Sequence, residues 1–292
     1  MPQWQGKSKG TSTGYRIFVF LIKTFGTGGA YLLLRFVSLY YFFFSPATSK
    51  SILALYKNIL KFSTLKSLSL LYKNYYTLGQ TLIDKVALMS GAATNFMFNF
   101  DGEENLREMI SLKKGGLLLS GHLGNWEAAG QLLKRLETRI NIVMYDGEDA
   151  NIKKYLEEVT GAKTFKIIYI KNDLSHIFQI NEALSSNEIV CMHADRFLEG
   201  NKTITTNFFG KPAKFPEGPF LLASRLKVPV AYVYAFKETS KHYHFYSTEI
   251  KFFDNKNKDT MQSIAQDYSN SLESMTRMYP EQWFNYYDFW KA

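Results

Sequence analysis

The sequence predicts an α/β fold: a mostly parallel mixed sheet flanked by helices, preceded by an N-terminal hydrophobic helical segment. After about residue 98, short apolar runs alternate with stretches of helical periodicity, which is the pattern of a parallel sheet covered on both faces. The chain has 292 residues, and 46% of them are hydrophobic, which is enough for a substantial core. Before residue 45, aromatic and aliphatic side chains dominate.

Each element follows from the spacing of its apolar residues. Residues 45–100 are expected to be helical, because apolar side chains recur three and four apart, most clearly over 65–89. Apolar runs then predict strands over 115–121, 140–146, 165–171, 188–195, 229–237 and 242–250. The stretches between them predict helices over 126–136, 148–162, 172–187, 218–226 and 259–279.

The N-terminal segment points to a membrane surface. Residues 15–44 are apolar over a length that could span a bilayer, but Lys23, the glycine-rich stretch 26–29 and Arg35 interrupt them. We expect a pair of helices lying in the headgroup region; a membrane span with snorkelling charges and a helical hairpin packed on the body are the alternatives. No repeat or linker divides the rest, so we expect a membrane-associating segment over 1–45 and a single domain over 46–292.

The net charge limits the classes of binding partner, and the cysteine count limits disulfides and metal sites. The net charge of +9 suits an anionic membrane surface or an acidic protein, and no basic run resembles a nucleic-acid-binding arm. We therefore expect no nucleic-acid partner. The single cysteine, Cys191, excludes an intramolecular disulfide and a CxxC metal site, and its apolar neighbours indicate a buried small hydrophobe.

Polar side chains gather where the predicted strands end. In a parallel sheet, ligands bind beyond the carboxyl ends of the strands. The residues expected at that edge are His122, Tyr145, His193, Asp195 and Arg196.

A histidine and a carboxylate follow the first of these strands. His122 comes directly after it, and Glu127 falls in the first turn of the next predicted helix. A carboxylate that accepts from one ring nitrogen fixes the tautomer, so the other nitrogen can take a proton from a hydroxyl group. Ser120 does not stand in a GxSxG motif, so no serine nucleophile is predicted here.

Residues 117–127, LLLSGHLGNWE, resemble the HxxxxD/E signature of glycerolipid acyltransferases, which belong to the lysophospholipid acyltransferase superfamily. The H-x-G-N-W-E form is typical of the bacterial lipid A biosynthesis acyltransferases, the late lauroyl and myristoyl transferases. HADR at 193–196, FFGKPAKFPEGPFLLASRLKVPV at 208–230 and YPEQW at 279–283 follow in that family's order. The resemblance therefore covers most of the chain.

The resemblance implies direct attack of a lipid hydroxyl on an acyl thioester, with no metal, no other cofactor and no covalent acyl-enzyme. It makes His122 the general base and Glu127 its orienting partner, and it places Asp195 at an acidic position lining the site. Arg196 would hold a phosphate of the donor or the acceptor, or would pair with Asp195 at the strand end. Main-chain N–H groups at the helix start, near Asn125 to Glu127, are expected to stabilise the oxyanion.

The implied partners are an acyl carrier protein, or coenzyme A, as carrier of the acyl group, a lipid acceptor, and an anionic membrane surface. The implied place is the cytoplasmic face of a bacterial inner membrane. Asp146 stands where related enzymes often carry a basic residue, and the C-terminus lacks their arginines, so an aminolipid or a polyene pigment joins a lipid A precursor as candidate acceptor. A thioesterase or lipase that uses the same His–Glu pair on water is the alternative activity.

Three further residues or segments carry expectations. His242 and His244 alternate on one strand and are expected to be exposed. The aromatic C-terminus, residues 283–290, is expected to face lipid; the alternative is a lid on the core.

Overall fold

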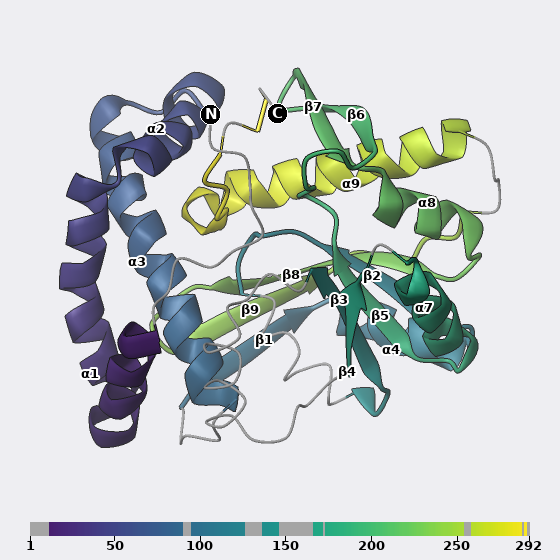
Figure 1. The fold of residues 1–292 in the computed structure, drawn as a ribbon, viewed down its shortest axis with the longest axis horizontal. Helices are drawn as coiled ribbons and strands as arrows, with labels where there is room; N and C mark the ends of the chain where they lie inside the picture. Colours follow the sequence, from purple (N-terminus) through teal and green to yellow (C-terminus); the bar gives the residue numbers. More distant parts are fainter. Residues whose placement is uncertain are drawn as a thin grey trace.

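The computed structural model describes residues 12–89, 95–125, 136–145, 166–171, 173–253, 258–287 and 289–290. Within them, seven strands form one sheet in the order β1-β9-β8-β2-β5-β3-β4 (Figure 1). Their bounds are β1 Met97–Asp101, β2 Gly116–Ser120, β3 Ile140–Tyr145, β4 Lys166–Ile170, β5 Ile189–His193, β8 Val230–Lys237 and β9 His242–Ser247. The pairing between β8 and β9 is antiparallel and the other pairs are parallel, so the predicted mostly parallel sheet is confirmed.

The helices cover both faces of this sheet. Leu117 and Leu119 of β2 belong to the larger core cluster, which also takes in α8 (Glu217–Arg225) and α9 (Lys258–Met278). Leu118 points to the opposite face and packs with Met109 of α4 (Glu103–Ser111). All five residues of β2 are buried, because neighbouring strands and both helical layers enclose it, and this explains its unbroken apolar run.

Strands β2 and β5 set the position of the site. They lie side by side and in parallel, with Ser120 opposite His193. The residues that follow the two strands therefore emerge together at the carboxyl edge of the sheet.

Four elements differ from expectation. Strand β1 lies in the region expected to be helical. It is five residues long and at the edge of the sheet, so its alternation of apolar and polar residues is too short to predict a strand. Helix α4 was not anticipated. A two-stranded hairpin, β6 (Thr203–Phe208) and β7 (Lys211–Pro216), replaces the expected loop before α8. The helices expected over 126–136 and 148–162 lie outside the described residues, apart from Leu136.

The N-terminal segment is a long helix with one break. Helix α1 (Ser12–Phe44) has non-helical backbone angles at Gly26, where φ is +68°. The segment from Arg16 to Phe44 is long and apolar enough to cross a membrane, with a mean hydropathy of 1.7 over an 18-residue window. One side of the helix packs along α3 (Thr64–Met89) (Figure 1). The boundary at residue 45 falls between α1 and α2 (Pro46–Ala54), and the division into two parts stays a prediction.

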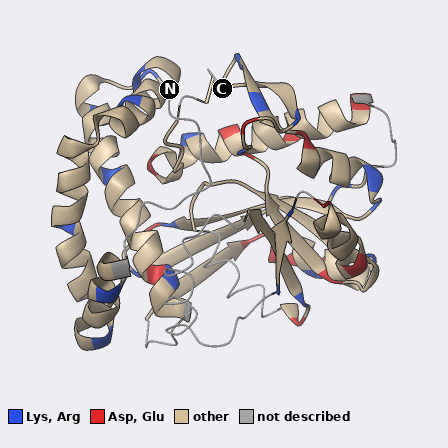
Figure 2. Cartoon of the chain, viewed as in Figure 1, with Lys and Arg blue, Asp and Glu red and all other residues tan. Residues whose placement is uncertain are grey.

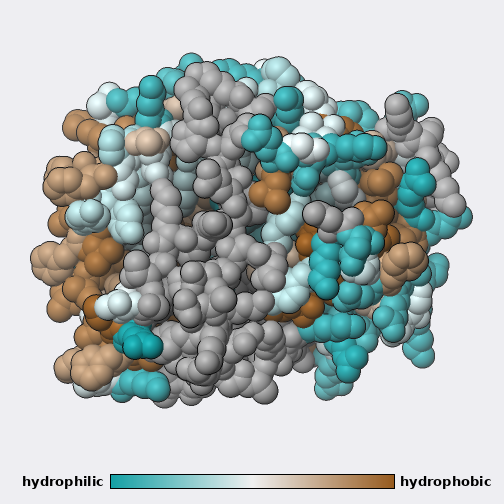
Figure 3. Space-filling view, in the orientation of Figure 1, coloured by the Kyte–Doolittle hydropathy of each residue, from teal (hydrophilic) through white to brown (hydrophobic). Residues whose placement is uncertain are grey.

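The other side of α1 is exposed and apolar. Figure 3 shows hydrophobic side chains gathered along the edge that α1 forms. We call this surface the α1 apolar face; it consists of Ile17, Phe20, Phe25, Leu32, Leu33, Phe36, Leu39, Tyr40, Tyr41, Phe43 and Phe44. Exposed apolar surface of this extent is typical of an interaction site.

Candidate active site

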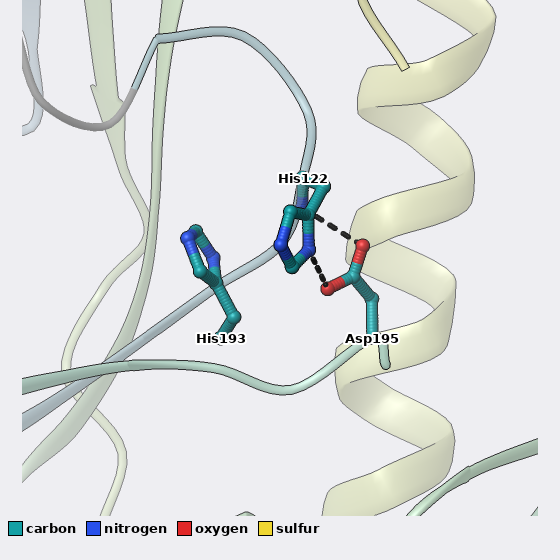
Figure 4. A group of neighbouring side chains, drawn as sticks. All are labelled: His122, His193 and Asp195. Carbon is teal, nitrogen blue, oxygen red and sulfur yellow. Dashed lines mark hydrogen bonds and ion pairs between the residues drawn. The ribbon is translucent and has the colours of Figure 1, made fainter. Parts of the chain in front are cut away.

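His122 and Asp195 form a hydrogen-bonded pair at the carboxyl edge of the sheet (Figure 4). The ring nitrogen Nδ1 of His122 lies 2.8 Å from Oδ1 of Asp195. The main-chain N–H of His122 donates to the other carboxylate oxygen, Oδ2, also at 2.8 Å. One carboxylate thus fixes both the backbone and the ring of His122, and it favours the tautomer with the proton on Nδ1. Nε2 is then the nitrogen that can take a proton.

The surroundings keep this carboxylate ionised. The Asp195 side chain is 1% exposed, whereas that of His122 is 25% exposed. Burial alone would raise the pKa of Asp195, but the charge and hydrogen bond of His122 and the charge of Arg196 together hold that pKa well below its usual range. A buried, charged acceptor beside a partly exposed imidazole is the arrangement of a general base and its orienting group.

His193 completes the cluster. Its ring centroid lies 4.4 Å from that of His122. Burial, followed by the nearby charges of His122 and Arg196, lowers the pKa of His193 to about 3, so this imidazole is neutral at physiological pH. A neutral ring beside His122 adds no competing positive charge when His122 is protonated.

Two glycines near His122 stand where the backbone is closely packed. A Cβ at Gly121 would lie 3.0 Å from the hydroxyl oxygen of Tyr268 and 3.2 Å from the carboxylate carbon of Asp195. Gly124 has a φ of +78°, and a Cβ there would meet the Ala235 carbonyl oxygen at 2.0 Å. Gly124 is therefore required by its backbone angle and by the close approach of β8, and Gly121 lets the loop pass close to the Asp195 carboxylate.

The C-terminal segment holds the same loop from the other side. The amide of Gly124 donates to the Gln282 carbonyl at 2.9 Å, and the amide of Phe284 donates to the His122 carbonyl at 2.9 Å. Arg196 donates through Nη2 to the Phe284 carbonyl. Trp283, in the same segment, is 2% exposed. The segment is a lid on the core, so the expectation that it faces lipid was wrong.

The remaining predicted site residues take different places. The Asn125 side chain is buried and donates to the Tyr243 hydroxyl at 3.0 Å, and its main-chain N–H donates to the Ala235 carbonyl at 2.7 Å. Tyr145 accepts from the Asn201 amide at 2.7 Å. Glu127 lies outside the described residues, so its role as orienting partner stays a prediction, as does the oxyanion role of main-chain N–H groups beyond Asn125.

His242 and His244 are partly buried, with side chains 17% and 16% exposed, so the expectation that they are exposed was wrong. The Nδ1 atoms of both rings contact the Glu238 carboxylate, at 3.0 and 3.1 Å. They form a separate polar cluster at the start of β9.

Among the described residues, His122, His193 and Asp195 are of the right type and close enough together to be considered for a metal ion, each offering one atom within 4.8 Å of the others. Two ligand atoms on one tetrahedral zinc ion lie about 3.3 Å apart, given metal–ligand distances of about 2.0–2.1 Å. The 2.8 Å separation of Nδ1 and Oδ1 is that of a hydrogen bond. The distance between His122 Nδ1 and Asp195 Oδ1 therefore fits a shared proton better than a shared metal ion.

Residues 67–292 match the family described as bacterial lipid A biosynthesis acyltransferase. Over 123 residues the chain is also 25% identical to phosphatidylinositol mannoside acyltransferase of Mycobacterium tuberculosis strain ATCC 25618 / H37Rv. The protein of that name from strain CDC 1551 / Oshkosh gives the same identity over the same length. These matches cover 42% of this chain and 39% of each relative, so the similarity spans well under half of the curated relatives.

Proposed function

Because the chain belongs to the bacterial lipid A biosynthesis acyltransferase family, we propose that it transfers a fatty acyl chain from a thioester to a hydroxyl group of a membrane lipid. The observation that carries this proposal is the His122–Asp195 pair, with a buried carboxylate behind a partly exposed imidazole. The pair provides a base for the acceptor hydroxyl.

The chemistry needs one base and no enzyme-bound acyl group. Nε2 of His122 takes the proton of the acceptor hydroxyl as the oxygen forms a bond to the thioester carbonyl carbon. Asp195 stabilises the imidazolium that results. The C–S bond then breaks, and the departing thiolate takes the proton from His122, so the base returns to its starting state.

The first class of acceptor in this proposal is a glycolipid. The family is described by lipid A biosynthesis, and the mycobacterial relatives are named for phosphatidylinositol mannoside, so both descriptions refer to lipids that carry sugars. A lipid A precursor is the first candidate, and an aminolipid or a pigment ester follows. The donor is an acyl carrier protein or coenzyme A thioester, whose negative charge suits the net charge of +9.

The proposed place of action is the membrane surface. Residues 12–89 contain nine lysines and arginines and one acidic residue, Asp84. Figure 2 shows the basic residues distributed along the N-terminal helices, and Figure 3 shows the apolar side chains beside them. Apolar side chains together with nearby positive charge bind anionic bilayers, and in a bacterium this corresponds to the cytoplasmic face of the inner membrane.

The first prediction concerns this surface. Replacing Phe20 and Phe36, which are 63% and 65% exposed on α1, with Glu is expected to weaken partitioning into phosphatidylglycerol-containing vesicles by about tenfold or more. Vesicle co-sedimentation at limiting lipid measures it. The matched control is Phe178→Glu on α7 (Ser175–Ser185), where the phenylalanine is 77% exposed away from α1. Equal partitioning of all three proteins would place the membrane contact elsewhere.

The second prediction tests the reaction itself. Purified protein with acyl carrier protein thioester, or with acyl-coenzyme A, and a lipid A precursor is expected to release free thiol only when the acceptor is present, with one acyl chain gained by the lipid. Thiol release and lipid mass spectrometry measure the two products. Thiol release that is independent of the acceptor would identify a thioesterase instead. Release that does not depend on His122, tested with His122→Ala, would remove the proposed base.

A further inference from the structure

A buried ion pair lies outside the site. The Lys237 ammonium contacts an Asp84 carboxylate oxygen at 2.5 Å, with side chains 2% and 0% exposed. Asp84 is also the one acidic residue among residues 12–89, so it is the exception in a basic and apolar segment. Burying two charges is costly unless every donor and acceptor is satisfied.

The neighbouring groups satisfy this pair. Lys237 Nζ donates to Asp84 Oδ2, to the Tyr31 hydroxyl at 3.1 Å and to the Ser240 carbonyl at 3.0 Å, which accounts for the three protons of the ammonium. The hydroxyls of Tyr31 and Tyr243 donate to the two carboxylate oxygens of Asp84. Four elements meet in this network: α1, α3, β8 and β9.

The network reaches the His122 loop. Because the Tyr243 hydroxyl gives its proton to Asp84, it can accept a hydrogen bond, and the Asn125 side-chain amide donates to it at 3.0 Å. The Asn125 main-chain N–H also donates to Ala235, two residues before Lys237 on β8. Asn125 stands three residues after His122. One chain of hydrogen bonds therefore runs from α1 to the loop that carries the base.

We propose that Tyr31, Asp84, Lys237 and Tyr243 are positioning residues that couple the packing of α1 to the placement of His122. The proposal rests on the proposed function, in which His122 must face the acceptor hydroxyl. Apolar packing would hold α1 against α3 as firmly. A buried network in which every polar group is hydrogen-bonded also fixes the orientation and register of α1 relative to α3. Hydrogen bonds thus connect α1, which carries the α1 apolar face, to the loop that holds His122, the proposed base.

The test uses single hydroxyl deletions. Tyr31→Phe and Tyr243→Phe remove one hydrogen-bonding group each and keep the ring. We expect kcat to fall by about tenfold with KM unchanged, because small displacements of a reacting group cost rate more than binding. The matched controls are Tyr232→Phe on β8, whose hydroxyl donates to Asp267 at 2.8 Å, and Tyr246→Phe on β9, whose hydroxyl contacts His244 and Tyr279. Both controls are expected to keep the wild-type kcat.

Hydrogen–deuterium exchange of peptides covering residues 121–125 gives a readout that needs no catalysis. Faster exchange in Tyr31→Phe and Tyr243→Phe, but in neither control, is the expected result. A lower melting temperature with unchanged kcat and unchanged loop exchange would show a purely structural network and overturn the proposal. If the wild-type protein proves to hydrolyse thioesters, the proposed function fails, and loop exchange together with the hydrolysis rate still decides the coupling.

Discussion

Asp195→Asn is expected to lower kcat by about 10²–10⁴-fold while the protein stays folded. An asparagine has one oxygen where the carboxylate has two, and that oxygen is needed by the main-chain N–H of His122. The amide NH₂ group then faces Nδ1 of the ring and donates to it, which moves the imidazole proton to Nε2. An imidazole protonated at Nε2 cannot accept the proton of the acceptor hydroxyl. Steady-state kinetics with acyl donor and lipid acceptor measure the loss.

The control for this substitution is Asp173→Asn, which is expected to keep wild-type kinetics, because that aspartate is exposed and accepts from the Ser175 amide before α7. The pH dependence adds a second readout. Without the negative charge the imidazolium is harder to form, so the acid limb of the pH–activity profile should move to lower pH. A folded variant with an unchanged rate and an unchanged acid limb would mean that another carboxylate, such as Glu127, orients the base.

The same carboxylate has a defined effect on stability. Since the pKa of Asp195 is lower in the folded protein than in the unfolded chain, its contribution to stability is present above the unfolded pKa, about 3.9. That contribution is lost as the pH falls below about 4 towards the folded value. The stability of wild type should therefore approach that of Asp195→Asn only in strong acid, as followed by urea denaturation.

The parallel core of the sheet could be predicted from sequence, and the reason is physical. Strands such as β2 and β5 are buried on both faces and read as unbroken apolar runs. Strand β1 and the hairpin β6–β7 lack this property, because alternate residues along β1 and β6 are exposed. Their apolar pattern alone could not separate them from helix or loop.

The position of His122 at the end of β2 could be predicted, but its observed hydrogen-bond partner could not. His122 and Asp195 are 73 positions apart, and only the register that sets Ser120 opposite His193 brings them together. Sequence alone favours a carboxylate close to His122 along the chain, and it therefore predicts Glu127 as the orienting partner. The contact between the C-terminal segment and the His122 loop was hidden for the same reason, since main-chain hydrogen bonds between remote segments leave little trace in side-chain composition.

Trp283→Ala is expected to lower the free energy of unfolding by about 3–5 kcal/mol, equivalent to a fall in Tm of about 6–20 °C. The indole is 2% exposed, and its ring centroid lies 5.6 Å from that of Phe208 and 5.3 Å from that of Phe289. Removing it leaves a cavity among aromatic side chains that cannot collapse readily. Urea denaturation measures the loss, and Phe178→Ala, at a 77% exposed position, is expected to stay within about 0.5 kcal/mol of wild type.

The position of Trp283 makes this substitution more than a test of packing. It pairs with Leu123 in an isolated β-bridge, and the next residue, Phe284, binds both the His122 carbonyl and Arg196. A loosened C-terminal segment should therefore reduce kcat below the melting transition, where the rest of the chain is still folded. Wild-type kcat in a variant destabilised by several kcal/mol would show that the carboxylate of Asp195 and the glycines hold His122 without help from the C-terminus. A parallel loss of both would show that the C-terminal segment belongs to the machinery that holds the base.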